Sequence, residues 1–84
     1  MAPDNKVEVR FQIPGDVIDR LRGRLGLSTN TDVVREALTL LDWASSEKEK
    51  GRVILSADKD GGNLTKLWMS SLENVKERST VAVA

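Results

Sequence analysis

The sequence predicts a small α+β protein in which one N-terminal strand and two helices precede a C-terminal β-hairpin-like extension. Three observations predict this fold class: strict alternation of apolar and polar residues over 7–13, two consecutive segments of helical periodicity, and turn-forming residues at 58–63 between two short apolar runs. The chain has 84 residues, which is enough for one domain and a short extension.

The N-terminal strand is expected over residues 7–13, which read VEVRFQI. A period of two means that one face of the strand is buried and the other face is exposed to solvent or a partner. Pro14 ends the strand and suits the first position of a helix, because its missing N–H would be unpaired there. Residues 1–5 are polar and contain Pro3, and we expect them to form a flexible arm.

A short amphipathic helix is expected after Pro14. Apolar residues recur every four positions at Val17, Leu21 and Leu25, and Gly26 is a suitable stop. The opposite side carries charged residues, among them Arg20, Arg22 and Arg24. Such arginines more often form a solvated helix face than contact phosphates.

A second helix is expected to begin after Thr29, whose side chain can cap the helix start three residues before Asp32. The helix is apolar over more than half of its circumference from Val33 to Ala44, and Gly51 ends it. A helix this apolar needs two surfaces to bury against, one in its own subunit and one in another.

The extension, residues 52–84, is expected to contain a hairpin. Residues 52–57 and 64–69 are short strand-like runs, and the residues between them, DKDGGN, strongly favour a tight turn. The polar segment after 69 is expected to be helical near 72–78 and to end in a loose tail.

The apolar end of this hairpin has two interpretations. Trp43 falls late on the second helix, where it could cover Trp68 as ordinary packing, the commoner role of such residues. Alternatively, the hairpin binds another protein through a patch made of Leu64, Leu67, Trp68 and Met69.

The N-terminal strand needs a neighbour, because a lone strand leaves its backbone N–H and C=O groups unpaired. The candidates are the hairpin of the same chain and the same strand from a second subunit, antiparallel about a two-fold axis. The second candidate also explains the apolar second helix. The chain has no cysteine for disulfides and no cysteine or histidine for a zinc site. This absence further favours stabilisation by a partner subunit.

Residues 7–14, VEVRFQIP, and residues 29–38, TNTDVVREAL, in this order resemble the ribbon-helix-helix (Arc/MetJ-type) family of DNA-binding proteins. The similarity covers about residues 6–44. It implies an intertwined two-fold dimer whose DNA-binding and dimerisation domain spans 6–51. The apolar residues of the strand and second helix would form the dimer core: Val7, Val9, Phe11, Ile13, Val33, Val34, Ala37, Leu38 and Leu41.

The resemblance also implies that the paired strands lie in the major groove of double-stranded DNA. The base-reading side chains would be Glu8, Arg10 and Gln12. Arginine can contact guanine with two hydrogen bonds, glutamine can do the same with adenine, and glutamate can accept from cytosine. Phosphate contacts would come from Lys6 and from the start of the second helix, with Ser28, Thr29, Asn30 and Thr31.

The expected function is therefore that of a dimeric, sequence-specific transcription regulator, acting as a repressor. An alternative is an antitoxin that binds its promoter through the N-terminal half and a toxin through the C-terminal segment. A third interpretation is a structural oligomer without nucleic acid, which the net charge of zero favours.

Other classes have less support in the sequence. Without histidine or cysteine, and without a serine–lysine pair or paired carboxylates on a rigid site, we expect neither an enzyme nor a cofactor. The turn at 58–63 lacks the spacing and the closing glutamate of a calcium loop. No signal peptide or membrane segment is recognisable, and a cytoplasmic location is expected.

Overall fold

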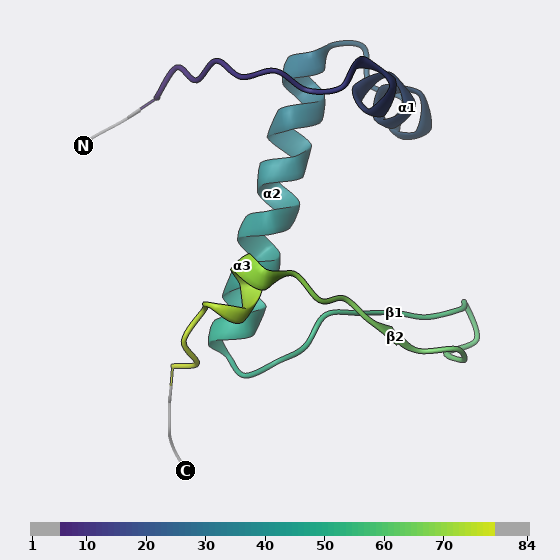
Figure 1. Ribbon diagram of the computed structural model, residues 1–84. Helices are drawn as coiled ribbons and strands as arrows, with labels where there is room; N and C mark the ends of the chain where they lie inside the picture. The colour runs from purple at the N-terminus through teal and green to yellow at the C-terminus, as the bar shows by residue number, and fades with distance from the viewer. Residues whose placement is uncertain (1–5, 79–84) are drawn as a thin grey trace. The chain divides into compact units, whose positions relative to one another are not determined.

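The computed structural model describes residues 6–78 and shows an α+β chain with a two-stranded antiparallel sheet (Figure 1). Its elements are α1 (Gly15–Leu25), α2 (Asn30–Glu49), β1 (Leu55–Ser56), β2 (Thr65–Lys66) and α3 (Ser70–Glu73). The contacts divide the chain into two compact units, with the division inside α2 between Val34 and Arg35. The arm expected at 1–5 and the end of the expected tail, 79–84, lie outside the described residues.

The strand expected over 7–13 does not form within the single chain. Residues 6–14 belong to neither a helix nor a strand, and across residues 6–78 the sheet pairing is that of β1 with β2. The side chains of Val7, Val9 and Phe11 are 80%, 65% and 57% exposed. A segment becomes a strand only where another strand accepts and donates its hydrogen bonds, so its expected pairing with a second subunit stays a prediction.

Helix α1 begins and ends where the sequence predicts. The carbonyl of Pro14 accepts the N–H of Ile18 at 3.3 Å, which starts the helix. Gly26 ends it in the left-handed conformation, with φ 67° and ψ 30°. The N–H of Leu27 then reaches back to the carbonyl of Arg22 at 3.0 Å, the bond that defines a Schellman motif.

Helix α2 ends in the same way, at Gly51, the glycine that was predicted to end it. Gly51 has φ 80°, and the N–H of Arg52 donates to the carbonyl of Glu47 at 3.0 Å. A Cβ built on Gly51 would lie 2.5 Å from Oε2 of Glu77. The carboxylate end of the Glu77 side chain can move aside, so the positive φ is the stronger reason why this position requires glycine.

The predicted hairpin is confirmed, although its strands are only two residues long. Leu55 pairs with Lys66, and Ser56 pairs with Thr65. The turn is closed by an N–H of Asp58 that donates to the carbonyl of Gly62 at 2.8 Å. The ladder stops early because no third strand or helix covers the hairpin within the described residues, and isolated two-stranded hairpins are marginal in water.

Helix α3 is shorter than the expected helix near 72–78 and begins earlier, because tertiary contacts rather than periodicity place it. Leu72 is only 4% exposed. Lys48 on α2 lies 3.5 Å from the carboxylate of Glu73, and the N–H of Arg78 donates to the carbonyl of Glu49 at 2.7 Å. The last carbonyls of α2 thereby gain a partner from the C-terminal segment.

The core is small. Among the described residues, the buried apolar side chains are those of Ile18, Val33, Ala44 and Leu72. Trp43 and Trp68 are 51% and 65% exposed, so the expected packing of Trp43 over the hairpin does not form. The hairpin projects away from α2 instead of lying along it (Figure 1).

Two glycine substitutions should change stability in opposite directions. Gly23 lies inside α1 with nothing within 4 Å of a built Cβ, so Gly23→Ala should raise the free energy of unfolding by about 0.5–1 kcal/mol. Gly51→Ala should lower it by about 1–2 kcal/mol, because alanine is strained at this positive φ. Urea unfolding at a fixed protein concentration measures both. Equal midpoints for the two variants would contradict the conformation of Gly51.

Candidate nucleic-acid interface

The start of α2 presents a capped helix N-terminus. Oγ1 of Thr29 accepts the N–H of Asp32 at 3.0 Å, which confirms the predicted cap. The side chains of Ser28, Thr29, Asn30 and Thr31 are all exposed. Four of the five expected phosphate-contacting residues therefore share one turn, next to the N–H groups and positive dipole end of a helix.

Arg22, one of the arginines expected on the solvated face of the first helix, also lies at this site. Nη1 of Arg22 donates to Oδ1 of Asn30 at 2.7 Å, and Nη2 lies 2.7 Å from Oδ1 of Asp19. The guanidinium is thus held beside the first residue of α2. Periodicity cannot reveal this contact, because it depends on how the turn after Gly26 returns the chain.

These contacts limit what each side chain can offer a phosphate. Oγ1 of Thr29 and Oδ1 of Asn30 accept hydrogen bonds, which leaves the hydroxyl hydrogen of Thr29 and Nδ2 of Asn30 as groups that can still donate to an anion. The other donors at this turn are backbone N–H groups, the hydroxyls of Ser28 and Thr31, and the guanidinium of Arg22. The site suits an anion that accepts several hydrogen bonds, as a phosphate does.

The expected base-reading residues lie on the segment that precedes α1. Glu8, Arg10 and Gln12 are exposed, as is Lys6, the fifth expected phosphate contact. The structure does not bring them to the start of α2 by any described interaction. Their spacing of two residues would place them on one face, about 6.5–7 Å apart, wherever the segment is extended.

The expected dimer core is mostly uncovered in the single chain. Val33 is 4% exposed and belongs to the chain's own core, and Ile13 and Val34 are half-buried. Leu38 and Leu41 are 61% and 42% exposed. The remaining members are also exposed: Val7, Val9, Phe11 and Ala37.

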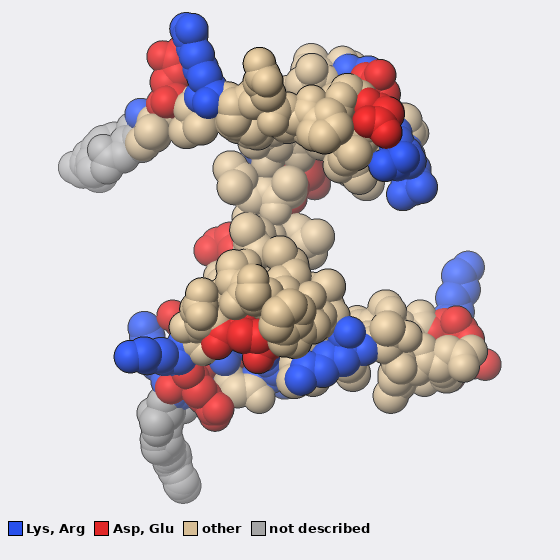
Figure 2. Space-filling view, viewed as in Figure 1, with Lys and Arg blue, Asp and Glu red and all other residues tan. Residues whose placement is uncertain are grey.

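The possible partner-binding patch on the hairpin is exposed as well. Leu64, Leu67, Trp68 and Met69 are between 39% and 65% exposed. On the face shown in Figure 2, charged atoms gather near the turn of the hairpin and around the end of α2. Large apolar side chains exposed in this way suit contact with protein better than contact with DNA.

The structure shows no site for a metal within residues 6–78, where no three carboxylate, histidine or cysteine residues cluster. No helix in that part of the chain is long and apolar enough to span a bilayer. Comparison of the chain with protein-family models, with curated proteins and with solved structures returned no match.

Removing the cap of α2 should destabilise the N-terminal unit. Thr29→Ala should lower the free energy of unfolding by about 1 kcal/mol, because the N–H of Asp32 loses its acceptor. Thr29→Ser retains the hydroxyl and serves as the matched control. Urea unfolding compares the two, and identical curves would show that the Thr29 hydroxyl does not cap the helix.

Proposed function

We propose that the protein is a dimeric DNA-binding transcription regulator. Residues 7–13 of two subunits pair as an antiparallel ribbon that enters the major groove, and the dimer acts as a repressor by occupying its site. The location of such a regulator is the cytoplasm, where it meets chromosomal DNA. No cofactor takes part in this activity.

The observation that carries the proposal is the state of the segment before α1. It alternates strictly, yet it forms no strand in its own chain, and its apolar residues Val7, Val9 and Phe11 are more than half exposed. Covering one such side chain contributes about 1.5–3 kcal/mol. A second copy can both cover these residues and satisfy the backbone groups of the segment, whereas solvent satisfies only the backbone.

A ribbon made in this way presents three polar side chains from each subunit on its other face. Arg10 and Gln12 are suited to guanine and adenine, and Glu8 can accept from cytosine or pair with Arg10. A flat two-stranded ribbon fits the width of the major groove. The resemblance of residues 7–14 and 29–38 to the ribbon-helix-helix family supports the same assignment.

The charges support a local rather than a global attraction to DNA. The net charge of the chain is zero, so affinity must come from particular cations. Lys6 and Arg10 are exposed on the N-terminal segment, and Arg22 lies at the start of α2 with a row of hydrogen-bond donors. Phosphate contacts at that helix start would position the ribbon, while the ribbon reads the bases.

Two neighbouring substitutions separate DNA reading from dimer formation. Sites are first selected from random DNA, and affinity is then measured against salt. Arg10→Ala should cost about 1–3 kcal/mol in binding and relax the base preference, while the dimer stays intact. Phe11→Ala should instead destabilise the folded dimer by about 3–5 kcal/mol.

Lys59→Ala is the control, because it removes one positive charge from the turn of the hairpin. Wild-type protein should show log K falling linearly with log salt. A flat salt response with no selected sequence would leave the structural oligomer as the better explanation. Unchanged preference in Arg10→Ala would remove this residue from base recognition.

A second candidate function is that of an antitoxin, and the exposed hairpin patch favours it. Leu64 and Trp68 are 64% and 65% exposed, although they are large and apolar. A toxin or other protein could cover them. Such partner-binding segments are commonly disordered alone and fold on their target.

Hydrogen exchange on the isolated protein distinguishes the two candidates. We expect the amides of Asp58 and Leu67 to exchange slowly, because they donate to the carbonyls of Gly62 and Ile54 at 2.8 Å. Amides of α2 provide the internal reference for protection. Rapid exchange throughout 52–69 would show that the extension is unfolded alone and would favour the antitoxin.

A further inference from the structure

The charged residues at the end of α2 are enclosed to an unusual degree. The side chains of Glu47 and Lys48 are only 15% and 16% exposed, whereas charged side chains mostly face water. An enclosed charge needs an oppositely charged or hydrogen-bonding partner to offset its loss of hydration. Partners of both residues come from the extension that follows α2.

Three consecutive residues at the end of α2 each pair with an oppositely charged residue of the extension. The pairs, with their nitrogen–oxygen distances, are Glu47 with Arg52 at 2.6 Å, Lys48 with Glu73 at 3.5 Å and Glu49 with Arg78 at 3.9 Å. The sign of the charge alternates along both sets of residues, so a shift of the pairing by one position would bring like charges together. We call these three pairs the charge clasp.

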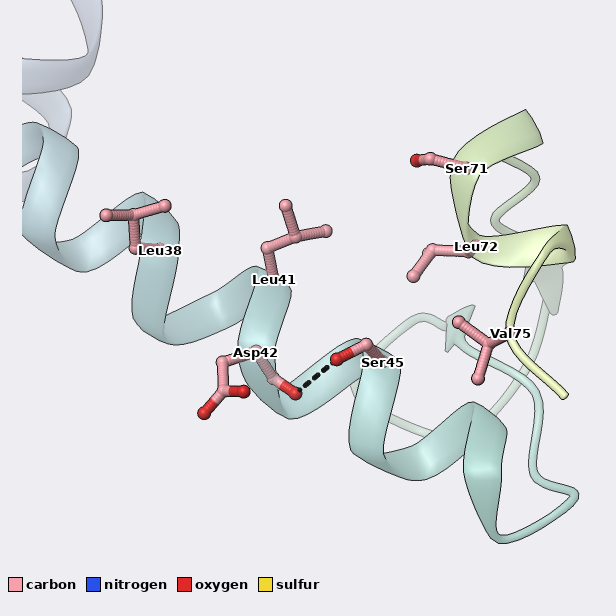
Figure 3. A pocket seen from close by; sticks show the side chains of 7 residues that line it. All are labelled: Leu38, Leu41, Asp42, Ser45, Ser71, Leu72 and Val75. Atoms are coloured by element: carbon pink, nitrogen blue, oxygen red, sulfur yellow. Dashed lines mark hydrogen bonds between the residues drawn. The ribbon is translucent and has the colours of Figure 1, made fainter. Parts of the chain in front are cut away.

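The segment that the charge clasp holds has little apolar anchorage of its own. We call residues 70–78, which comprise α3 and the turn and chain that follow it, the strap. Leu72 is its one buried side chain, and Val75 is half-buried. Figure 3 shows both side chains directed toward α2 across an open groove. A helix of one turn is unstable by itself in water, so contacts with α2 keep the strap ordered.

The end of the strap also contacts α2 through polar groups. The N–H of Arg78 donates to the carbonyl of Glu49 at 2.7 Å. Glu77 lies against Gly51, where a built Cβ would be 2.5 Å from its Oε2. Arg78 and Glu77 are both exposed, so water and salt ions can compete for these contacts. Closure of the strap therefore relies on charge as well as on the burial of Leu72.

The charge clasp also holds both ends of the hairpin. Arg52 precedes β1 and Glu73 follows β2, and their partners are consecutive residues of α2. When the strap leaves α2, the hairpin stays attached through Arg52 alone. Leu72 then becomes exposed a few residues from the apolar patch at 64–69, which is exposed already.

We propose that the strap is a salt-sensitive closing element. The charge clasp holds it on α2 at low ionic strength, and screening of the clasp opens it by local unfolding while the helices stay folded. Opening uncovers Leu72 and enlarges the apolar surface beside the hairpin. This device belongs to the extension and does not depend on DNA binding.

Amide hydrogen exchange on the full chain, at a fixed protein concentration, tests the response to salt. The Arg78 amide reports closure, and the Leu27 amide, which donates to the carbonyl of Arg22 at 3.0 Å in the N-terminal unit, is the reference. Raising NaCl from about 0.1 M to about 1 M shortens the screening length from about 10 Å to about 3 Å. Exchange at Arg78 should accelerate about threefold or more relative to Leu27. An unchanged ratio overturns the salt-sensitive closure.

Charge reversal within one pair tests the clasp itself. Lys48→Glu and Glu73→Lys should each accelerate exchange at Arg78 about fivefold in low salt, because an attraction becomes a repulsion. The double variant should return to within about twofold of the wild-type rate. Lys50→Glu is the matched control, since it makes the same change of charge at a lysine that pairs with Glu47 and not with the extension.

The control and the double variant decide the outcome. Equal acceleration by Lys50→Glu and Lys48→Glu, or no recovery in the double variant, overturns the charge clasp. A single variant that fails to fold also loses protection at Leu27, and recovery in the double variant then still tests the pairing. Binding of an apolar fluorescent dye should rise in Lys48→Glu and not in Lys50→Glu. Equal dye binding would overturn the exposure of Leu72.

Discussion

The unpaired backbone of residues 7–13 is the constraint on which the remaining structure depends. A segment of alternating residues has hydrogen-bonding groups on two edges and apolar side chains on one face. Within the described residues its backbone has no strand partner, and Val7, Val9 and Phe11 are more than half exposed. Extending α1 backwards would not help, because Pro14 lacks an N–H and restricts the residue before it. A partner strand is the arrangement that satisfies both requirements at once.

The helix ends were predictable because they are encoded by a few neighbouring residues. Thr29 caps α2, and Gly26 and Gly51 adopt positive φ where each helix stops. The N-terminal strand and α3 were not predictable in the same way. A strand exists only with its neighbour, and α3 is placed by the burial of Leu72 and by contacts to the end of α2 that no local pattern contains.

The candidate site shows the same division between local and tertiary information. The exposed positions Glu8, Arg10 and Gln12 follow directly from the period of two, and the donors at the start of α2 follow from its cap. The place of Arg22 at this site was not predictable, because its contact with Asn30 crosses the turn between two helices. Its guanidinium is also paired with the carboxylate of Asp19 at 2.7 Å, so it adds hydrogen-bond donors to the helix start more than net positive charge.

The proposed dimer would make DNA binding depend on more of the chain than the ribbon alone. Ribbon pairing involves the N-terminal segment, whereas Leu38 and Leu41 of the expected dimer core lie on α2 and are 61% and 42% exposed, so both stretches would contribute to the same association equilibrium. Apolar residues also remain on the other side of α2, where Trp43 lies about 140° around the helix from Leu38 and is 51% exposed. Because only the dimer would carry a complete ribbon, any partner that stabilises the paired state would raise the apparent affinity for DNA by mass action, even without touching it.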